Sequence, residues 1–66
     1  MRINIEAERG RNGLTKTALS KKMKISLTTY NSYLKGAAIP SDKLIFLADL
    51  FGVSCDYLLE IETKHQ

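Results

Sequence analysis

The sequence has few of the residues on which disulfides, metal sites and catalytic centres are built. It contains one cysteine, Cys55, and one histidine, His65, and it has neither a glycine-rich phosphate loop nor a cluster of metal ligands. A single cysteine excludes an internal disulfide, and Cys55 with His65 is too small a set for a zinc site. Cys55 has no basic neighbour in sequence, so we expect a small hydrophobic side chain rather than a reactive thiol. The sequence therefore argues against an enzyme, a metal site and a bound cofactor.

Long apolar runs are also missing. No stretch is long enough to cross a membrane, and the N-terminal residues do not form the apolar region of a secretion signal. A lone thiol is typical of the reducing cytoplasm, which is where we expect the protein to act.

The composition that remains is that of one small globular domain. The 66 residues are 44% apolar, which is enough for a core and too much for a disordered chain. The single proline and the four glycines fall at boundaries between segments of helical periodicity, and no segment reads as a strand. We predict one all-α domain over residues 1–66, with a core at about 3–61 and a polar tail at 62–66.

Caps, glycines and apolar spacing divide the chain into five predicted helices. Thr15, Ser26 and Ser54 are of the types that cap helix N-termini, and Pro40 opens a further helix. The first, third and fourth helices each end at a glycine. The predicted helices cover about residues 3–12, 15–23, 26–36 and 40–52, with a short fifth helix after 54.

Charge is distributed unevenly along the chain. The segment from residue 9 to residue 36 has no acidic residue but seven basic ones: Arg9, Arg11, Lys16, Lys21, Lys22, Lys24 and Lys35. From residue 39 onward the balance reverses, and the net charge is only +3. This division favours one surface suited to a polyanion. The alternative is an unevenly charged surface that meets only solvent.

The basic segment also has the pattern of a helix-turn-helix. Leu19 and Met23 lie inside its first helix, Ile25 follows the turn, and Tyr30 and Tyr33 lie inside its second helix. A small residue stands at position 20, where two helices cross closely. The two tyrosines match the buried face, so we expect core residues whose hydroxyl tips reach water rather than stacking platforms for bases. The alternative is any helical hairpin with a polar outer face.

The run LTKTALSKKMKISLTTYNSYLKGAAIPSDKLIFLADLFGVSCDYLL resembles the Cro/C1-type (Xre-like) helix-turn-helix domain of phage-type repressors, and PSDKLIFLADLFGVSCDYLL is its most specific part. The resemblance covers roughly residues 5–59. It implies a five-helix DNA-binding domain whose third helix enters the major groove, and a two-fold dimer on a roughly palindromic operator. We therefore expect a transcriptional regulator, a repressor of phage or mobile-element type.

Three positions depart from the family pattern. Lys24 stands at the turn, where glycine is usual, so we expect a strained left-handed residue or a different turn. Lys16 replaces a glutamine at the start of the second helix and exchanges a neutral phosphate contact for a charged one. Leu34 replaces a glutamate that pairs with the arginine matching Arg9, which leaves Arg9 to find Glu6, Glu8 or a phosphate.

The resemblance and the charge pattern together predict the contacts to DNA. By resemblance, Leu27, Thr28 and Ser32 face the bases, and Asn31 reads adenine if it faces the groove. None of the three family positions carries a long bidentate donor, so we expect weak direct readout and more reliance on phosphates and DNA shape. The predicted phosphate contacts are Arg9, Thr15, Lys16, Lys24, Ser26 and Lys35.

Dimerisation is predicted through the C-terminal third. The fourth and fifth helices carry more apolar residues than one buried stripe needs, and the spares come from Phe46, Leu50, Leu58, Leu59 and Ile61. The resemblance adds Cys55 and Tyr57. The alternative is that all of them complete the core of the monomer.

Two other functions use the same fold. One is an antitoxin that binds a partner protein as well as its own operator, and the other is an adaptor that contacts the transcription machinery. The basic segment favours contact with double-stranded DNA in each case, and no small-molecule ligand is expected.

Overall fold

The computed structural model describes residues 1–61, which form five helices joined by short turns. The helices are α1 (Ile3–Arg11), α2 (Lys16–Met23), α3 (Leu27–Lys35), α4 (Ser41–Phe51) and α5 (Cys55–Leu59). No strand occurs within residues 1–61. The all-α prediction is confirmed, whereas the predicted polar tail at 62–66 lies outside the described residues.

The helix N-termini form where the sequence predicts them. The side chains of Thr15, Ser26 and Ser54 each accept the backbone N–H of the residue three positions later, at 3.0, 3.1 and 3.1 Å. Each oxygen satisfies one of the N–H groups that a helix leaves unpaired at its start. The first turns of α2, α3 and α5 are therefore fixed by their own capping residues.

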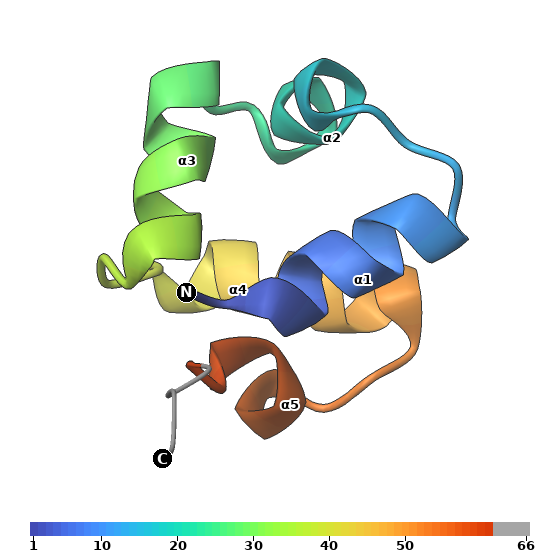
Figure 1. Ribbon diagram of the computed structural model, residues 1–66, viewed down its shortest axis with the longest axis vertical. Coiled ribbons are helices and arrows are strands. Elements are labelled where there is room, and N and C mark those ends of the chain that lie inside the picture. The colour runs from blue at the N-terminus through green and yellow to red at the C-terminus, as the bar shows by residue number, and fades with distance from the viewer. Residues whose placement is uncertain (62–66) are drawn as a thin grey trace, which may run out of the picture.

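Figure 1 shows α1 (blue) crossing the middle of the molecule between α3 and α5. Helix α1 packs against α3 and α5, α2 packs against α3 and α4, and α4 packs against α5. The fully buried side chains come from all five helices and meet between them: Ile5, Leu19, Met23, Tyr30, Leu47 and Leu58. This core holds α2 and α3 as a pair on one side of the molecule.

The two tyrosines of α3 belong to this core. Tyr30 is 1% exposed and Tyr33 is 7% exposed, as the spacing predicts. The expectation of a wet hydroxyl is wrong for Tyr30, because its hydroxyl donates a 2.6 Å hydrogen bond to Oε2 of Glu6 on α1. A protein carboxylate has taken the place of water at the tip of this side chain.

Candidate nucleic-acid interface

Helix α3 has a buried side and an outer side. Its buried residues are Tyr30, Tyr33 and Leu34. The four predicted base-contacting residues lie on the other side, where Leu27 is 42% exposed, Thr28 is exposed, and Asn31 and Ser32 are half-buried. Positions i, i+1, i+4 and i+5 share one face of a helix. Ser32 Oγ donates to the carbonyl oxygen of Thr28 at 3.2 Å, so its remaining capacity toward an outside group is that of an acceptor.

The N-termini of α2 and α3 carry no negative charge. Neither helix has an acidic residue in its first turn, whereas the first turns of α1, α4 and α5 contain Glu6, Asp42 and Asp56. A helix N-terminus attracts anions through its free N–H groups and its dipole, and a nearby carboxylate competes for that attraction. Neither helix start therefore has an acidic residue of its own to compete with an external anion, although the charge of Glu6 on α1 reaches Lys16 at the start of α2.

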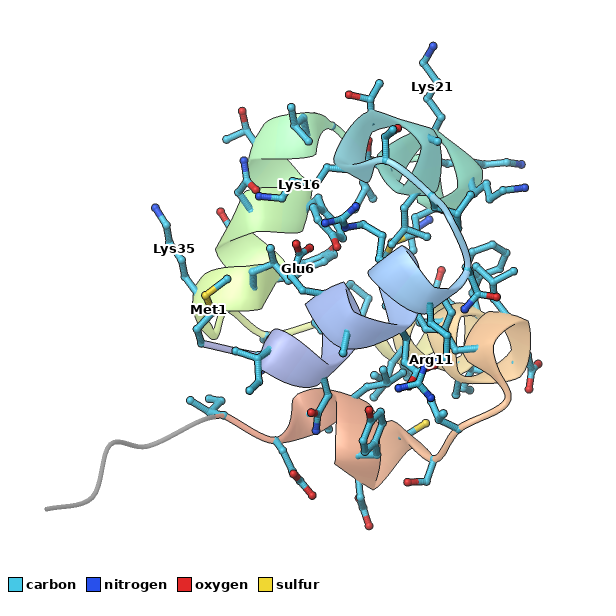
Figure 2. The ribbon with its side chains drawn as sticks, turned by 45° about the vertical axis from the view of Figure 1, so that its right-hand side comes forward. Met1, Glu6, Arg11, Lys16, Lys21 and Lys35 are labelled. Atoms are coloured by element: carbon cyan, nitrogen blue, oxygen red, sulfur yellow. The ribbon has the colours of Figure 1, made fainter. Side chains whose placement is uncertain are left out.

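Exposed lysines flank this pair of helices. Lys16 begins α2, Lys24 follows its last turn, and Lys35 ends α3, and all three side chains are exposed. Lys16 and Lys35 also line one shallow pocket of about 250 Å³, together with Met1, Asn31 and Leu34. Figure 2 shows Met1 and Lys35 at the left-hand edge of the molecule and Lys16 further in, drawn across α3, while Lys21 extends away from α2 at the top.

Lys24 adopts the left-handed conformation, with φ 61° and ψ 43°. Gly13, Gly36 and Gly52 adopt positive φ at the ends of other helices, and Lys24 is the non-glycine residue that does so within residues 1–61. The strained left-handed lysine that the sequence suggested is therefore present. Its side chain leaves the turn between α2 and α3 toward solvent.

Arg9 is engaged inside the protein. Its guanidinium donates to both carboxylate oxygens of Glu6, at 2.7 and 3.1 Å, and to the carbonyl oxygen of Leu14 at 2.6 Å. These bonds hold the pKa of Glu6 below its usual value, while burial and the bond to Glu6 raise the pKa of Tyr30. Arg9 pairs with Glu6, one of the alternatives that the sequence left open. Because its guanidinium is occupied within the protein, we do not count Arg9 among the phosphate contacts.

The predicted dimer residues do not all lie at the surface. Leu58 is 0% exposed and packs in the core, so its assignment to a dimer interface is wrong for the described structure. Cys55 and Tyr57 are half-buried, and the Tyr57 hydroxyl donates to Glu8 at 3.1 Å. Leu59 and Ile61 are 37% and 50% exposed.

The exposed apolar surface of α4 comes from three of its residues. Phe46 and Leu50 are each 37% exposed and lie four residues apart, on one face of the helix. Ile45, which is not among the predicted spare apolar residues, is 54% exposed.

Two charged residues are buried, which the sequence did not indicate. Arg2 is 7% exposed and bonds to the end of α3, and Glu8 is 4% exposed and accepts from Tyr57. Arg2 bonds to Tyr33 and Glu8 bonds to Tyr57, and these two contacts have no sequence signal because they join residues at least 31 positions apart. Glu8 also lies 3.7 Å from Arg11, its neighbour three positions along α1. The Glu6–Arg9 pair did have a sequence signal, since residues three apart on a helix are neighbours.

Other kinds of site find no support in the part of the chain that is described. No helix there is long and apolar enough to span a membrane, and residues 1–61 hold no cluster of histidine, cysteine and acidic residues that fits a metal ion. Of the pair considered for zinc, His65 lies outside the described residues.

Comparison with known proteins gives one match. A family model described as helix-turn-helix matches residues 5–58, from the first turn of α1 to the next-to-last residue of α5. No curated protein and no solved structure matches the chain.

Proposed function

The chain belongs to the Cro/C1-type helix-turn-helix family of DNA-binding transcription regulators, and from this premise we propose that it is a repressor that binds a palindromic operator as a dimer. The observation that carries the proposal is that α2 and α3 have no acidic residue in their first turns and are flanked by exposed lysines. On this proposal the protein is of phage or mobile-element type and acts in the cytoplasm as a single domain.

Phosphate contacts supply most of the affinity in this proposal. Lys16, Lys24 and Lys35 neutralise phosphates, while the N-termini capped by Thr15 and Ser26 direct backbone N–H groups at the sugar-phosphate chain. Three lysines on each of two subunits release about six counterions, so log affinity should fall with log salt at a slope of about −5.

Sequence choice falls to the outer face of α3. Thr28 and Ser32 offer hydroxyl oxygens, Asn31 offers an amide that matches adenine, and Leu27 offers an apolar surface for a thymine methyl group. Because these side chains make single rather than bidentate contacts, except at Asn31, each lost contact should cost about 1 kcal/mol. Deformability of bases that the protein does not touch should then contribute to specificity.

Dimerisation places two α3 helices on half-sites about one helical turn apart. Leu59 and Ile61 at the end of α5 remain the candidates for this contact, with Cys55 and Tyr57 beside them. So small a domain makes few base contacts, and a second half-site is the available route to useful affinity.

The experiment is selection of binding sites from random duplex DNA, followed by mobility-shift titration over a range of salt concentrations. The selected sequences should contain two related half-sites, and Thr28→Ala or Ser32→Ala should change the preferred bases. Ser41→Ala is the matched control, because Ser41 is exposed but begins α4 in the acidic part of the chain. A flat salt response, or preferred sequences unaffected by both α3 variants, contradicts the proposal.

An antitoxin is the second candidate, and the exposed apolar residues of α4 favour it. Ile45, Phe46 and Leu50 are exposed apolar residues of α4, whereas the dimer contact proposed above is placed on α5. An antitoxin of this fold should bind a partner protein while still binding its own operator. Co-purification of one stoichiometric partner that Phe46→Ser abolishes, with DNA binding retained, distinguishes this role.

A further inference from the structure

Arg2 joins the start of the chain to the end of α3. Its backbone N–H donates to the carbonyl oxygen of Leu34 at 2.8 Å. Its Nη1 donates to the carbonyl oxygens of Tyr33 at 2.8 Å and Ala37 at 2.6 Å, and its Nη2 reaches that of Gly36 at 3.4 Å. Figure 1 shows the N-terminus beside the lower end of α3. Arg2 therefore donates to carbonyl groups at the end of α3 and in the turn that follows it.

This arginine is held by carbonyl groups rather than by a carboxylate. It is 7% exposed, and its Nε is buried without a hydrogen-bond partner. The ion pairs among the described residues join Glu6 to Arg9 and Glu8 to Arg11, so Arg2 has no carboxylate of its own. A helix C-terminus carries partial negative charge on its unpaired carbonyls, and the planar guanidinium has five N–H groups to offer them. The end of α3 thus supplies the environment that makes burial of this charge favourable.

The other parts of α3 are fixed by different contacts. Ser26 caps its N-terminus, and Tyr30 anchors its middle to Glu6. Its last turn closes through two backbone bonds, from the N–H of Gly36 to the carbonyl oxygen of Tyr33 and from the N–H of Ala37 to that of Ser32. Arg2 bonds to carbonyl groups of this closing turn on both sides of Lys35 in sequence.

We propose that Arg2 is a positioning residue for DNA binding, which acts by fixing the last turn of α3 and with it the direction of Lys35. The proposal rests on the function proposed above, in which α3 enters the groove and Lys35 meets a phosphate. Arg2 itself touches no DNA in this arrangement. Its loss leaves the carbonyls of the last turn to water and lets Lys35 move with that turn.

The test is a double-mutant cycle on operator affinity with Arg2→Met and Lys35→Ala. Methionine keeps most of the apolar length of the side chain and removes the guanidinium. We expect Arg2→Met alone to weaken binding at least tenfold at a temperature where circular dichroism shows full helicity. The effect of Lys35→Ala should then largely disappear in the Arg2→Met background, because residues that share one backbone segment are coupled through its movement, whereas independent residues add.

Lys16→Ala is the matched control for this cycle. It removes a lysine that lines the same pocket as Lys35, but Lys16 begins α2, whereas the hydrogen bonds of Arg2 go to the end of α3. Its effect should be the same with and without Arg2→Met. If the Lys35 cycle is also additive, Arg2 supports only the stability of the fold and the proposal is overturned.

Hydrogen exchange of the free protein tests the contact without DNA. Arg2→Met should speed exchange of the Gly36 and Ala37 amides and leave that of Thr29, at the other end of α3, unchanged. Should Arg2→Met not fold, Arg2→Lys replaces it and should give the same pattern to a smaller degree. Uniform acceleration along α3 overturns the positioning role. Failure of the unmodified chain to bind any duplex instead overturns the proposed function.

Discussion

At Lys24 the left-handed backbone favours glycine, whereas the proposed phosphate contact needs the charged lysine side chain. Helix α2 ends in a turn in which the N–H of Lys24 donates to the carbonyl oxygen of Lys21 at 3.1 Å, and the N–H of Ile25 donates to that of Ser20 at 3.0 Å. These two bonds define the Schellman ending, whose left-handed residue is usually glycine. In this chain the left-handed residue is a lysine, Lys24, with φ 61°.

Replacement by glycine should stabilise the fold and weaken DNA binding. A side chain in the left-handed region costs about 1–2 kcal/mol, and the greater freedom of glycine in the unfolded chain offsets about 0.4–1 kcal/mol of this. Lys24→Gly should therefore gain about 1 kcal/mol, which corresponds to a rise in melting temperature of about 4–8 °C for a domain of this size. Lys24→Ala should gain nothing, because alanine retains the Cβ.

Both variants remove the same charge, so both should weaken binding to DNA equally. The slope of log affinity against log salt should become less steep by about 0.9 for each lost phosphate contact, or about 2 for a dimer. Thermal melts followed by circular dichroism give the stability, and mobility shifts at several salt concentrations give the slope. The reasoning is refuted if glycine and alanine have equal melting temperatures, or if either variant binds DNA as tightly as the unmodified chain.

Three further predictions concern the interior. The bonds from Arg9 lower the pKa of Glu6, so the folded state favours the carboxylate; that stabilisation is present above the unfolded pKa of about 4.3 and is lost as the pH falls through the folded value. Thermal melts between about pH 5 and pH 3 should therefore decline more steeply for the unmodified chain than for Glu6→Gln, and parallel curves count against the pairing. Burial raises the pKa of Tyr30, which stabilises the fold below about pH 10 and ceases to do so as the pH rises toward the folded value; melts of Tyr30→Phe should lack this alkaline loss. Leu58→Ala should lose about 2–5 kcal/mol in urea unfolding, whereas Leu59→Ala should leave monomer stability nearly unchanged and shift sedimentation toward monomer. If Leu58→Ala has only a small effect on the free energy of unfolding, Leu58 is not a core residue and the dimer-interface assignment stands.

Most of the fold was readable because its signals are local. A serine or threonine cap, a glycine in the left-handed region and an apolar residue every three or four positions each act within one helix turn. These signals located α1 to α5 to within a residue or so at most ends. The buried side of α3 followed from the same periodicity, since Tyr30 and Tyr33 are buried as their spacing predicts, whereas the base-facing residues were assigned by the family resemblance.

The polar contacts between helices were not readable, because they join residues far apart in sequence. Arg2 reaches across 31 residues to Tyr33, and Tyr30 reaches across 24 residues to Glu6. Leu58 was misassigned for a related reason: periodicity places it on an apolar face of α5, but only the packing of α1 and α4 decides whether that face is covered.

The loss of the family's glutamate at Leu34 gives these contacts their meaning. In the family pattern a carboxylate on the third helix meets an arginine on the first. Here the carboxylate is that of Glu6, which lies on the same helix as Arg9 and accepts from its guanidinium. The third helix contributes the hydroxyl of Tyr30, which donates to the same carboxylate. The ion pair of Arg9 therefore lies within α1, and Leu34 packs in the core at the position where the family pattern has a glutamate. Helix α3 keeps its attachment to α1 without any acidic residue of its own, which leaves its whole outer face free of negative charge.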